Sequence, residues 1–113
     1  MTRTVYLNGE YFLENEAKIS IFDRGFLMAD AVYEVTSVLD GKLIDFKGHA
    51  NRLNRSLDEL DMKNPISYEE LLVVHRELVH LNNIDEGLVF RYHAELHPTE
   101  ISYTLIQMRR IQQ

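Results

Sequence analysis

The stretch Phe22-Asp23-Arg24-Gly25-Phe26-Leu27-Met28-Ala29-Asp30-Ala31-Val32-Tyr33-Glu34-Val35 decides the fold of this chain. A glycine follows the charged pair Asp23-Arg24, which predicts a loop with an ion pair and a glycine at positive φ. The run from Ala31 to Leu39 is predicted to be a β-strand. Its two faces would carry alternate residues, with Ala31, Tyr33, Val35, Ser37 and Leu39 on one face and Val32, Glu34, Thr36 and Val38 on the other. We therefore expect the loop to fix a strand that carries Tyr33 and Val35 on one face.

Two glycine turns predict hairpins on either side of this strand. Asn8-Gly9 separates β-prone runs at 4–8 and 11–13, and Asp40-Gly41 leads from the central strand into a run at 42–46. Both dipeptides tolerate the positive φ of tight hairpin turns. Two hairpins so close in sequence indicate an antiparallel sheet.

Helical spacing follows the hairpins. Apolar residues recur every three or four positions between Lys47 and Leu60, which predicts an amphipathic helix. Ser67 and Glu70 match a capping box, and a second apolar stripe behind them predicts another helix that ends near Asn82.

The C-terminal part of the chain has a weaker pattern. Residues 87–90 predict a strand, 91–98 fit no regular element, and 101–108 are compatible with a strand. The predicted fold class is α+β, an antiparallel sheet with two adjacent helices.

Composition excludes several classes of protein. The 113 residues suffice for one domain, and 45% hydrophobic with 27% charged residues is typical of a globular protein. A net charge of −6 argues against a nucleic-acid partner, and the absence of cysteine excludes disulfides and thiolate zinc sites. We find neither a signal peptide nor an apolar run of about 20 residues, so we expect a cytoplasmic protein without a membrane partner.

Two side chains could carry chemistry. Arg52 is expected to point away from the apolar stripe of its helix, where its planar guanidinium suits bidentate binding of a phosphate. On spacing alone, a solvated helix arginine is the more common explanation. Tyr33 could bring its hydroxyl to a cleft at the end of the sheet, or could be a half-buried strand tyrosine.

The motifs around these residues resemble the fold-type-IV, or class-IV, pyridoxal-phosphate aminotransferases. The resemblance rests on Asp23-Arg24-Gly25, Val32-Tyr33-Glu34-Val35 and His49-Ala50-Asn51-Arg52-Leu53, and it covers about residues 4 to 90. It implies the small N-terminal domain of an enzyme similar to the D-amino-acid (D-alanine) aminotransferases. Such an enzyme binds pyridoxal 5′-phosphate and moves an amino group between a D-amino acid and a 2-oxo acid, as a homodimer.

The resemblance also implies roles for single residues. Arg52 would bind the cofactor phosphate, and Tyr33 and Val35 would line the substrate side of the cofactor. Alanine stands at position 31 where the family usually has glycine, which a β conformation tolerates. The branched-chain aminotransferases and the aminodeoxychorismate lyases of the same family are alternative interpretations of this resemblance.

The lysine that binds the cofactor covalently is missing. None of Lys18, Lys42, Lys47 and Lys63 stands in the family's lysine context. In the family this lysine belongs to a C-terminal catalytic domain, which we expect to be absent. The chain then has no catalytic residue of its own and should not transaminate alone.

The tail departs from the family pattern. We predict an aminotransferase-like domain at 1–90 and a non-family tail at 91–113, which begins with Arg91-Tyr92-His93-Ala94-Glu95. A frameshift or a miscalled base would explain this tail, and a genuine short paralogue with a diverged end is the alternative.

Two other functions stay open. A stray small domain could be a non-catalytic dimerisation or interaction module, whose exposed apolar face binds a partner. His93 and His97 have the spacing of a zinc hydrolase, but Ala94 replaces the companion glutamate and Pro98 disfavours a helix, so we expect no metal. His49, His75 and His80 are predicted to have no acid arranged around them.

Overall fold

The protein is described by a computed structural model. It describes residues 2–97 and 100–109, with the side chains of 95–97, 100, 108 and 109 left out of the description. In chain order the elements are β1 (Thr4–Leu7), β2 (Glu10–Leu13), α1 (Arg24–Met28), β3 (Ala31–Leu39), β4 (Lys42–Leu43), α2 (Phe46–Glu59), α3 (Tyr68–Leu81), β5 (Glu86–His97) and β6 (Glu100–Arg109).

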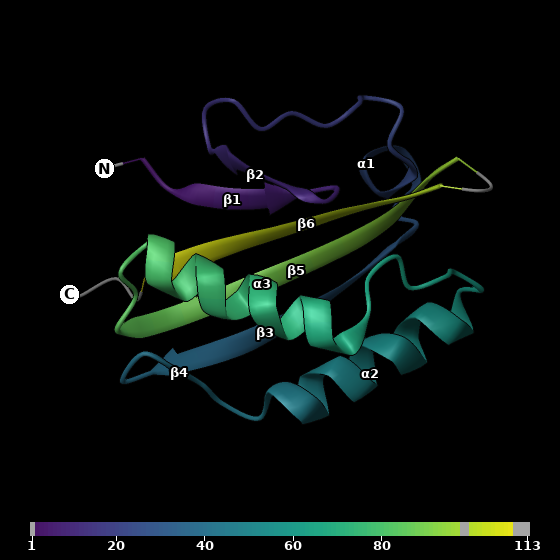
Figure 1. The fold of residues 1–113 in the computed structure, drawn as a ribbon. Coiled ribbons are helices and arrows are strands. Elements are labelled where there is room, and N and C mark those ends of the chain that lie inside the picture. The colour runs from purple at the N-terminus through teal and green to yellow at the C-terminus, as the bar shows by residue number, and fades with distance from the viewer. Residues whose placement is uncertain (1, 98–99, 110–113) are drawn as a thin grey trace.

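The strands form one six-stranded antiparallel sheet in the order β2-β1-β6-β5-β3-β4. The long strands β5 and β6 run through its middle (Figure 1). The expectation that residues 91–98 fit no regular element was wrong for 91–97, because β5 continues to His97 and pairs with β3 as far as Ala94, whereas residue 98 lies outside the described residues. Residues 91–97 and 100–109 therefore contribute to the centre of the sheet.

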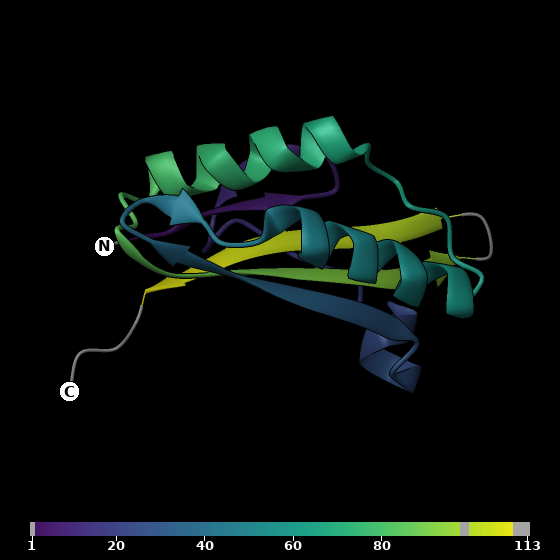
Figure 2. The same cartoon turned by 90° about the horizontal axis from the view of Figure 1, so that it is seen from below.

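Helices α2 and α3 cover one face of the sheet, and α1 lies on the opposite side (Figure 2). The main core fills the space between the sheet and the two long helices. Leu53 and Leu57 of α2 and Leu78 of α3 are almost completely buried there. Burial of each such side chain contributes about 1.5–3 kcal/mol relative to exposure. The α+β fold class is confirmed.

The predicted turns and helix ends are confirmed with small shifts. The hairpin turns contain Asn8, Gly9, Asp40 and Gly41, all at positive φ. The strand expected over 42–46 stops at Leu43, because Asp45 takes a left-handed conformation and its carboxylate accepts the Gly48 N–H to begin α2.

The second long helix begins as the capping pattern predicts. Ser67 is the N-cap of α3 and its hydroxyl accepts the N–H of Glu70 at 3.2 Å. At the other end Asn82 binds β1, since its amide donates to the Thr4 carbonyl and accepts the Thr4 N–H. None of the helices in the described ranges has the length and apolar character needed to cross a membrane.

Candidate functional site

The predicted loop before β3 is a short helix, α1. Asp23 caps it by accepting the N–H groups of Gly25 and Phe26, and it does not pair with Arg24, which instead lies 3.3 Å from Asp30. Gly25 does not have a positive φ; that conformation occurs at Ala29. Both details of the loop prediction were therefore wrong.

Gly25 is needed for a different reason, which is close approach to β5. A Cβ at this position would collide with the Tyr92 hydroxyl and would lie 2.8 Å from the Cβ of Ala94. The Tyr92 hydroxyl also reaches Asp23 at 3.5 Å. The absence of a side chain at Gly25 thus lets α1 rest on β5 and fixes the start of β3.

Arg52 and Glu34 are joined by three hydrogen bonds. Arg52 Nε donates to Glu34 Oε2 at 2.9 Å and to Oε1 at 3.1 Å, and Arg52 Nη2 donates to Oε1 at 2.6 Å. This is a bidentate grip between a planar guanidinium and a carboxylate. It joins α2 to β3 on the face of the sheet that the long helices cover.

His49 completes a cluster of three charged or titratable groups. It lies one turn before Arg52 on α2, and its Nδ1 is 2.8 Å from Glu34 Oε1. The expectation that no acid surrounds His49 was wrong. Burial raises the pKa of Glu34, but hydrogen bonds from Arg52 and His49 outweigh burial, so the pKa lies below its ordinary value. Glu34 is therefore an anion that both neighbours stabilise.

The exposure of the two partners differs strongly. The side chain of Glu34 is 4% exposed, whereas that of Arg52 is 58% exposed. Hydrogen bonds to Glu34 raise the pKa of Arg52, so the guanidinium is a permanent cation. Among the residues that the structure describes, no hydrogen bond engages Arg52 Nη1. Because the side chain is largely exposed, Nη1 is a candidate donor to an anion such as a phosphate.

Tyr33 lies on the other face of β3. Its ring is 64% exposed and stacks on Phe90 of β5, with ring centroids 5.5 Å apart and planes 12° from parallel. Val35 pairs with Phe90 in register, shares the face of Tyr33 and is partly buried. The structure brings Tyr33 and Val35 together as predicted, but it does not place them on the face that contains Arg52.

The edge of β3 connects the two faces. β4 pairs with β3 only at Val38 and Leu39, and the Ser37 carbonyl accepts the Ile44 N–H at 2.9 Å, so within the described residues the outer edge is unpaired over 31–36. A ligand at this edge could therefore meet Arg52 from one side and Tyr33 from the other.

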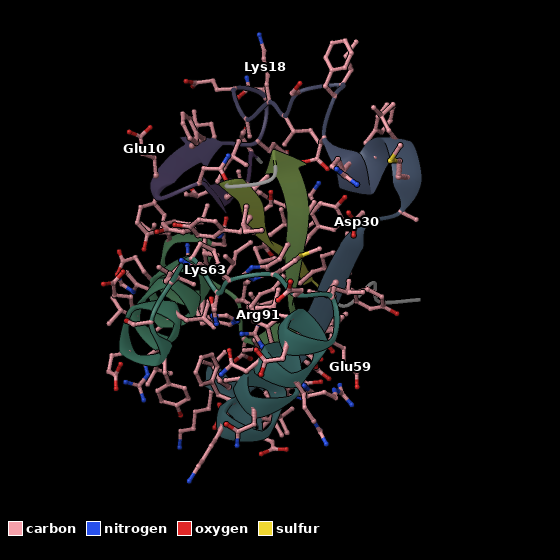
Figure 3. All side chains as sticks on the ribbon, turned by 90° about the vertical axis from the view of Figure 1, so that its right-hand side faces the viewer. Glu10, Lys18, Asp30, Glu59, Lys63 and Arg91 are labelled. Carbon is pink, nitrogen blue, oxygen red and sulfur yellow. The ribbon has the colours of Figure 1, made fainter. Side chains whose placement is uncertain are left out.

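A cluster of buried polar side chains lies beneath the helices. Arg91 is completely buried, and its guanidinium is 5.6 Å from the centre of the Phe46 ring (Figure 3). Within the described part of the chain none of its nitrogens has a hydrogen-bond partner. Burial lowers the pKa of Arg91 to about 10. The same region contains buried, incompletely bonded atoms of Thr36, His75, His93 and Gln107.

The two histidines of this cluster are held neutral. Burial, followed by the charge of Arg91, lowers the pKa of His75 to about 3 and that of His93 to about 4. His75 Nδ1 donates to the Leu71 carbonyl at 2.8 Å. His93 belongs to a strand, so the helical spacing of a zinc site does not apply to it, and the side chain of His97 lies outside the described residues.

A separate cleft of about 730 Å³ is not lined by Tyr33, Glu34 or Arg52. It is lined by Lys42, Phe46, Arg76, Val79 and His80 among others, between α3 and the β3–β4 hairpin. We regard the edge of β3 as the candidate site, because it combines an oriented cation with an exposed aromatic side chain.

Solved structures with this fold define the class. The branched-chain amino acid aminotransferase from Escherichia coli superposes with a TM-score of 0.88 and 15% identity, over 97% of this chain and 42% of its own. The branched-chain aminotransferase of Thermoproteus uzoniensis, solved with norvaline, has a TM-score of 0.84 and 20% identity, over 96% of this chain and 41% of its own. This likeness identifies the fold as that of an N-terminal domain of the class-IV aminotransferases.

Sequence relatives agree with the fold. A D-alanine aminotransferase of Staphylococcus haemolyticus is 41% identical over 86 residues, which is 76% of this chain and 30% of the relative. A D-alanine aminotransferase of Staphylococcus aureus is 34% identical over 113 residues, covering 88% of this chain and 40% of the relative. The chain is thus a homologue of the class-IV aminotransferases and corresponds to their N-terminal domain.

The relatives are not limited to one substrate class. A putative branched-chain-amino-acid aminotransferase of Methanocaldococcus jannaschii is 35% identical over 85 residues, or 75% of this chain and 30% of the relative. No protein-family model matches the chain. The chain spans well under half the length of these relatives.

Proposed function

We propose that this chain is the cofactor-phosphate-binding part of a pyridoxal-phosphate-dependent D-amino-acid aminotransferase. In this proposal Arg52 binds the phosphate of the cofactor, and Tyr33 and Val35 line the substrate side. The single observation that carries the proposal is the geometry of Arg52. Glu34 holds one edge of its guanidinium, and Nη1 of this largely exposed side chain is available to a phosphate.

The donor set fits the cofactor. A guanidinium at an exposed edge matches a phosphate dianion in charge and in planar hydrogen-bond geometry. When bound, pyridoxal phosphate supplies the electron sink for removal of a proton from the amino-acid α-carbon. Arg52 would anchor the cofactor at one end, while Tyr33 would present its phenol to the amino acid or 2-oxo acid.

Stable covalent attachment of the cofactor requires a lysine that we do not identify among Lys18, Lys42, Lys47 and Lys63. The domain boundary at residue 90 and the frameshift origin of residues 91–113 remain hypotheses. In our proposal the complete enzyme contains a second domain, acts on a D-amino acid such as D-alanine and a 2-oxo acid, and forms a homodimer.

A fusion protein tests the proposed function. Residues 1–109 would be joined to the remaining C-terminal part of the Staphylococcus haemolyticus D-alanine aminotransferase, which supplies a lysine. We expect the fusion to retain pyridoxal phosphate and to transaminate D-alanine, and the matched Arg52→Gln fusion to lose the cofactor on dialysis. A folded fusion whose cofactor retention does not depend on Arg52 would contradict the proposal.

A second candidate function is that of an interaction module. The side of the sheet away from α2 and α3 exposes Phe26, Leu27 and Met28 of α1 together with Tyr33. Several exposed large apolar side chains on one side of a sheet are typical of a surface that another domain or subunit covers. Sedimentation of the purified chain distinguishes the two: a stable dimer without affinity for a pyridoxal phosphate analogue would favour the module.

A further inference from the structure

We propose that Glu34 is a positioning residue, which holds Arg52 by its Nε–Nη2 edge so that Nη1 is directed at the phosphate of a ligand. This inference rests on the proposed function, because it takes Arg52 as the group that meets the phosphate. It adds the residue that sets the direction of the guanidinium.

The contrast in burial between the partners is the first argument. A long arginine side chain that is 58% exposed would ordinarily exchange among many rotamers. Three hydrogen bonds of 2.6–3.1 Å to one carboxylate instead fix both the position and the plane of the guanidinium. Because the fixed edge is Nε–Nη2, Nη1 is the guanidinium nitrogen that makes no hydrogen bond within the described residues.

Glu34 is itself held in place. It is 4% exposed within β3, and His49 contacts Oε1 at 2.8 Å. Glu34 is ionised and can only accept, so His49 Nδ1 must be the donor. His49 and Arg52 lie one helical turn apart, so α2 contacts the same carboxylate twice. The carboxylate therefore cannot swing away without breaking bonds to both side chains.

Arg91 supplies a second positive charge on the inner side of Glu34. The two residues are paired in register between β3 and β5, and both point to the face that α2 and α3 cover. The charge of Glu34 favours the charged form of Arg91. Arg91 makes no hydrogen bond to Glu34 in the described structure, but its charge means that two guanidiniums lie around one buried carboxylate. Nη1 of Arg52 keeps an attraction for an anion.

A simpler reading is that Glu34 and Arg52 only connect α2 to β3. That reading predicts a change in stability on mutation, but no particular effect on anion binding. Removal of the Glu34 charge should even strengthen anion binding, since a nearby negative charge would be lost. The positioning role predicts the opposite sign.

The experiment uses the full 113-residue chain labelled with ¹⁵N. The Arg52 Nε–H signal reports whether the guanidinium is held, through its rate of exchange with water. Its shift on titration reports binding of two probes, pyridoxamine 5′-phosphate and inorganic phosphate. Pyridoxamine 5′-phosphate has no aldehyde, so binding needs no lysine. The two probes distinguish recognition of the whole cofactor from recognition of phosphate alone.

Three variants separate position from charge. Glu34→Asp keeps the charge but withdraws the carboxylate by one methylene, and Glu34→Gln removes the charge. Asp45→Asn is the matched control, because Asp45 also contributes charge at Arg52 without a hydrogen bond to it. Asparagine can still cap α2 and tolerates the φ of 51° at this position.

We expect both Glu34 variants to bind pyridoxamine 5′-phosphate at least about fivefold more weakly, with faster exchange of the Arg52 Nε–H. Asp45→Asn should bind as well as the parent chain or better. Unchanged or tighter binding in folded Glu34→Asp and Glu34→Gln would overturn the positioning role, while leaving the proposed function intact if Arg52→Gln abolishes the shift.

Two further outcomes are decisive. If Arg52→Gln binds the probe as well as the parent chain, the proposed function fails whatever the Glu34 variants do. If both Glu34 variants fail to fold, His49→Gln decides the matter, because loss of the Nδ1 bond should loosen Glu34 and speed exchange of the Arg52 Nε–H. An unchanged exchange rate in that variant would count against the positioning role.

Discussion

On acidification this domain should begin to lose stability already below pH 6.5, because two histidines are buried in it. His75 has a pKa of about 3 and His93 of about 4 in the folded chain, against an ordinary value of 6.5. Between these values the unfolded chain binds protons that the folded chain does not. The free energy of unfolding therefore decreases as pH falls below 6.5, by about 1.4 kcal/mol per pH unit for each histidine.

The expected loss at pH 5 is about 2 kcal/mol for each histidine and about 4 kcal/mol for the pair. This is a large part of the roughly 5–15 kcal/mol that stabilises a typical domain. Glu34 does not offset it, because its pKa is lowered from 4.5 and the carboxylate is ionised in both states above pH 5. The lost stability returns when the pH rises above 6.5.

Urea unfolding followed by circular dichroism at pH 7.5, 6.5, 5.5 and 5.0 measures this loss. Dilute protein is required, since the calculated pI is about 5.3. Replacement of His75 and His93 by glutamine should each remove about half of the dependence on pH. His80→Gln, at an exposed position of α3, is the matched control and should leave the dependence unchanged. The reasoning is refuted if the chain without both buried histidines keeps the same dependence.

Three other substitutions should affect stability through separate parts of the fold. Gly25→Ala forces a Cβ into β5 and should lower the free energy of unfolding by about 1–3 kcal/mol in urea titrations; no loss would contradict the close approach of α1. Leu53→Ala should cost about 2–5 kcal/mol because the side chain is fully buried, whereas Leu60→Ala, which is 45% exposed, should cost much less; equal losses would argue against the assigned core. Asn82→Ala should cost about 2 kcal/mol and speed amide exchange at Thr4, whose N–H the asparagine binds; slow exchange in the variant would disprove this link.

Local sequence patterns were sufficient to predict most of the fold. The turns at Asn8-Gly9 and Asp40-Gly41, the strand Ala31–Leu39 and the two long helices all have short-range signals. The prediction missed α1, because a five-residue helix with no buried side chain leaves no apolar periodicity. A glycine at its second position further disguises it.

The continuation of β5 was missed for a different physical reason. On the face of β5 that Val89 shares, the next buried side chains are Arg91 and His93, whereas the other face carries the less buried Phe90 and Tyr92 before the buried Ala94. The hydrophobic pattern is therefore inverted, and alternation of apolar residues could not reveal the strand. Polar burial of this kind depends on contacts with helices that the local sequence does not specify.

The candidate site was predictable only in part. The resemblance of the motifs identified Arg52, Tyr33 and Val35 as candidates. The spacing of residues in the sequence did not show that Arg52 donates hydrogen bonds to Glu34. A signal was present, since alternation places Glu34 on the face opposite Tyr33, and a carboxylate on a covered face needs a cationic partner. The identity of that partner depends on how α2 crosses β3, which is a property of the tertiary fold.

The most direct test of the central claim compares two ligands that differ only in the phosphate. Pyridoxamine 5′-phosphate and pyridoxamine would be titrated against the fusion protein with Arg52 intact and with Arg52→Gln. We predict that the substitution weakens the phosphorylated ligand by at least about tenfold, the loss expected for a charge-assisted hydrogen bond, and leaves pyridoxamine unaffected. Equal preference for the phosphorylated ligand in both proteins would contradict the account.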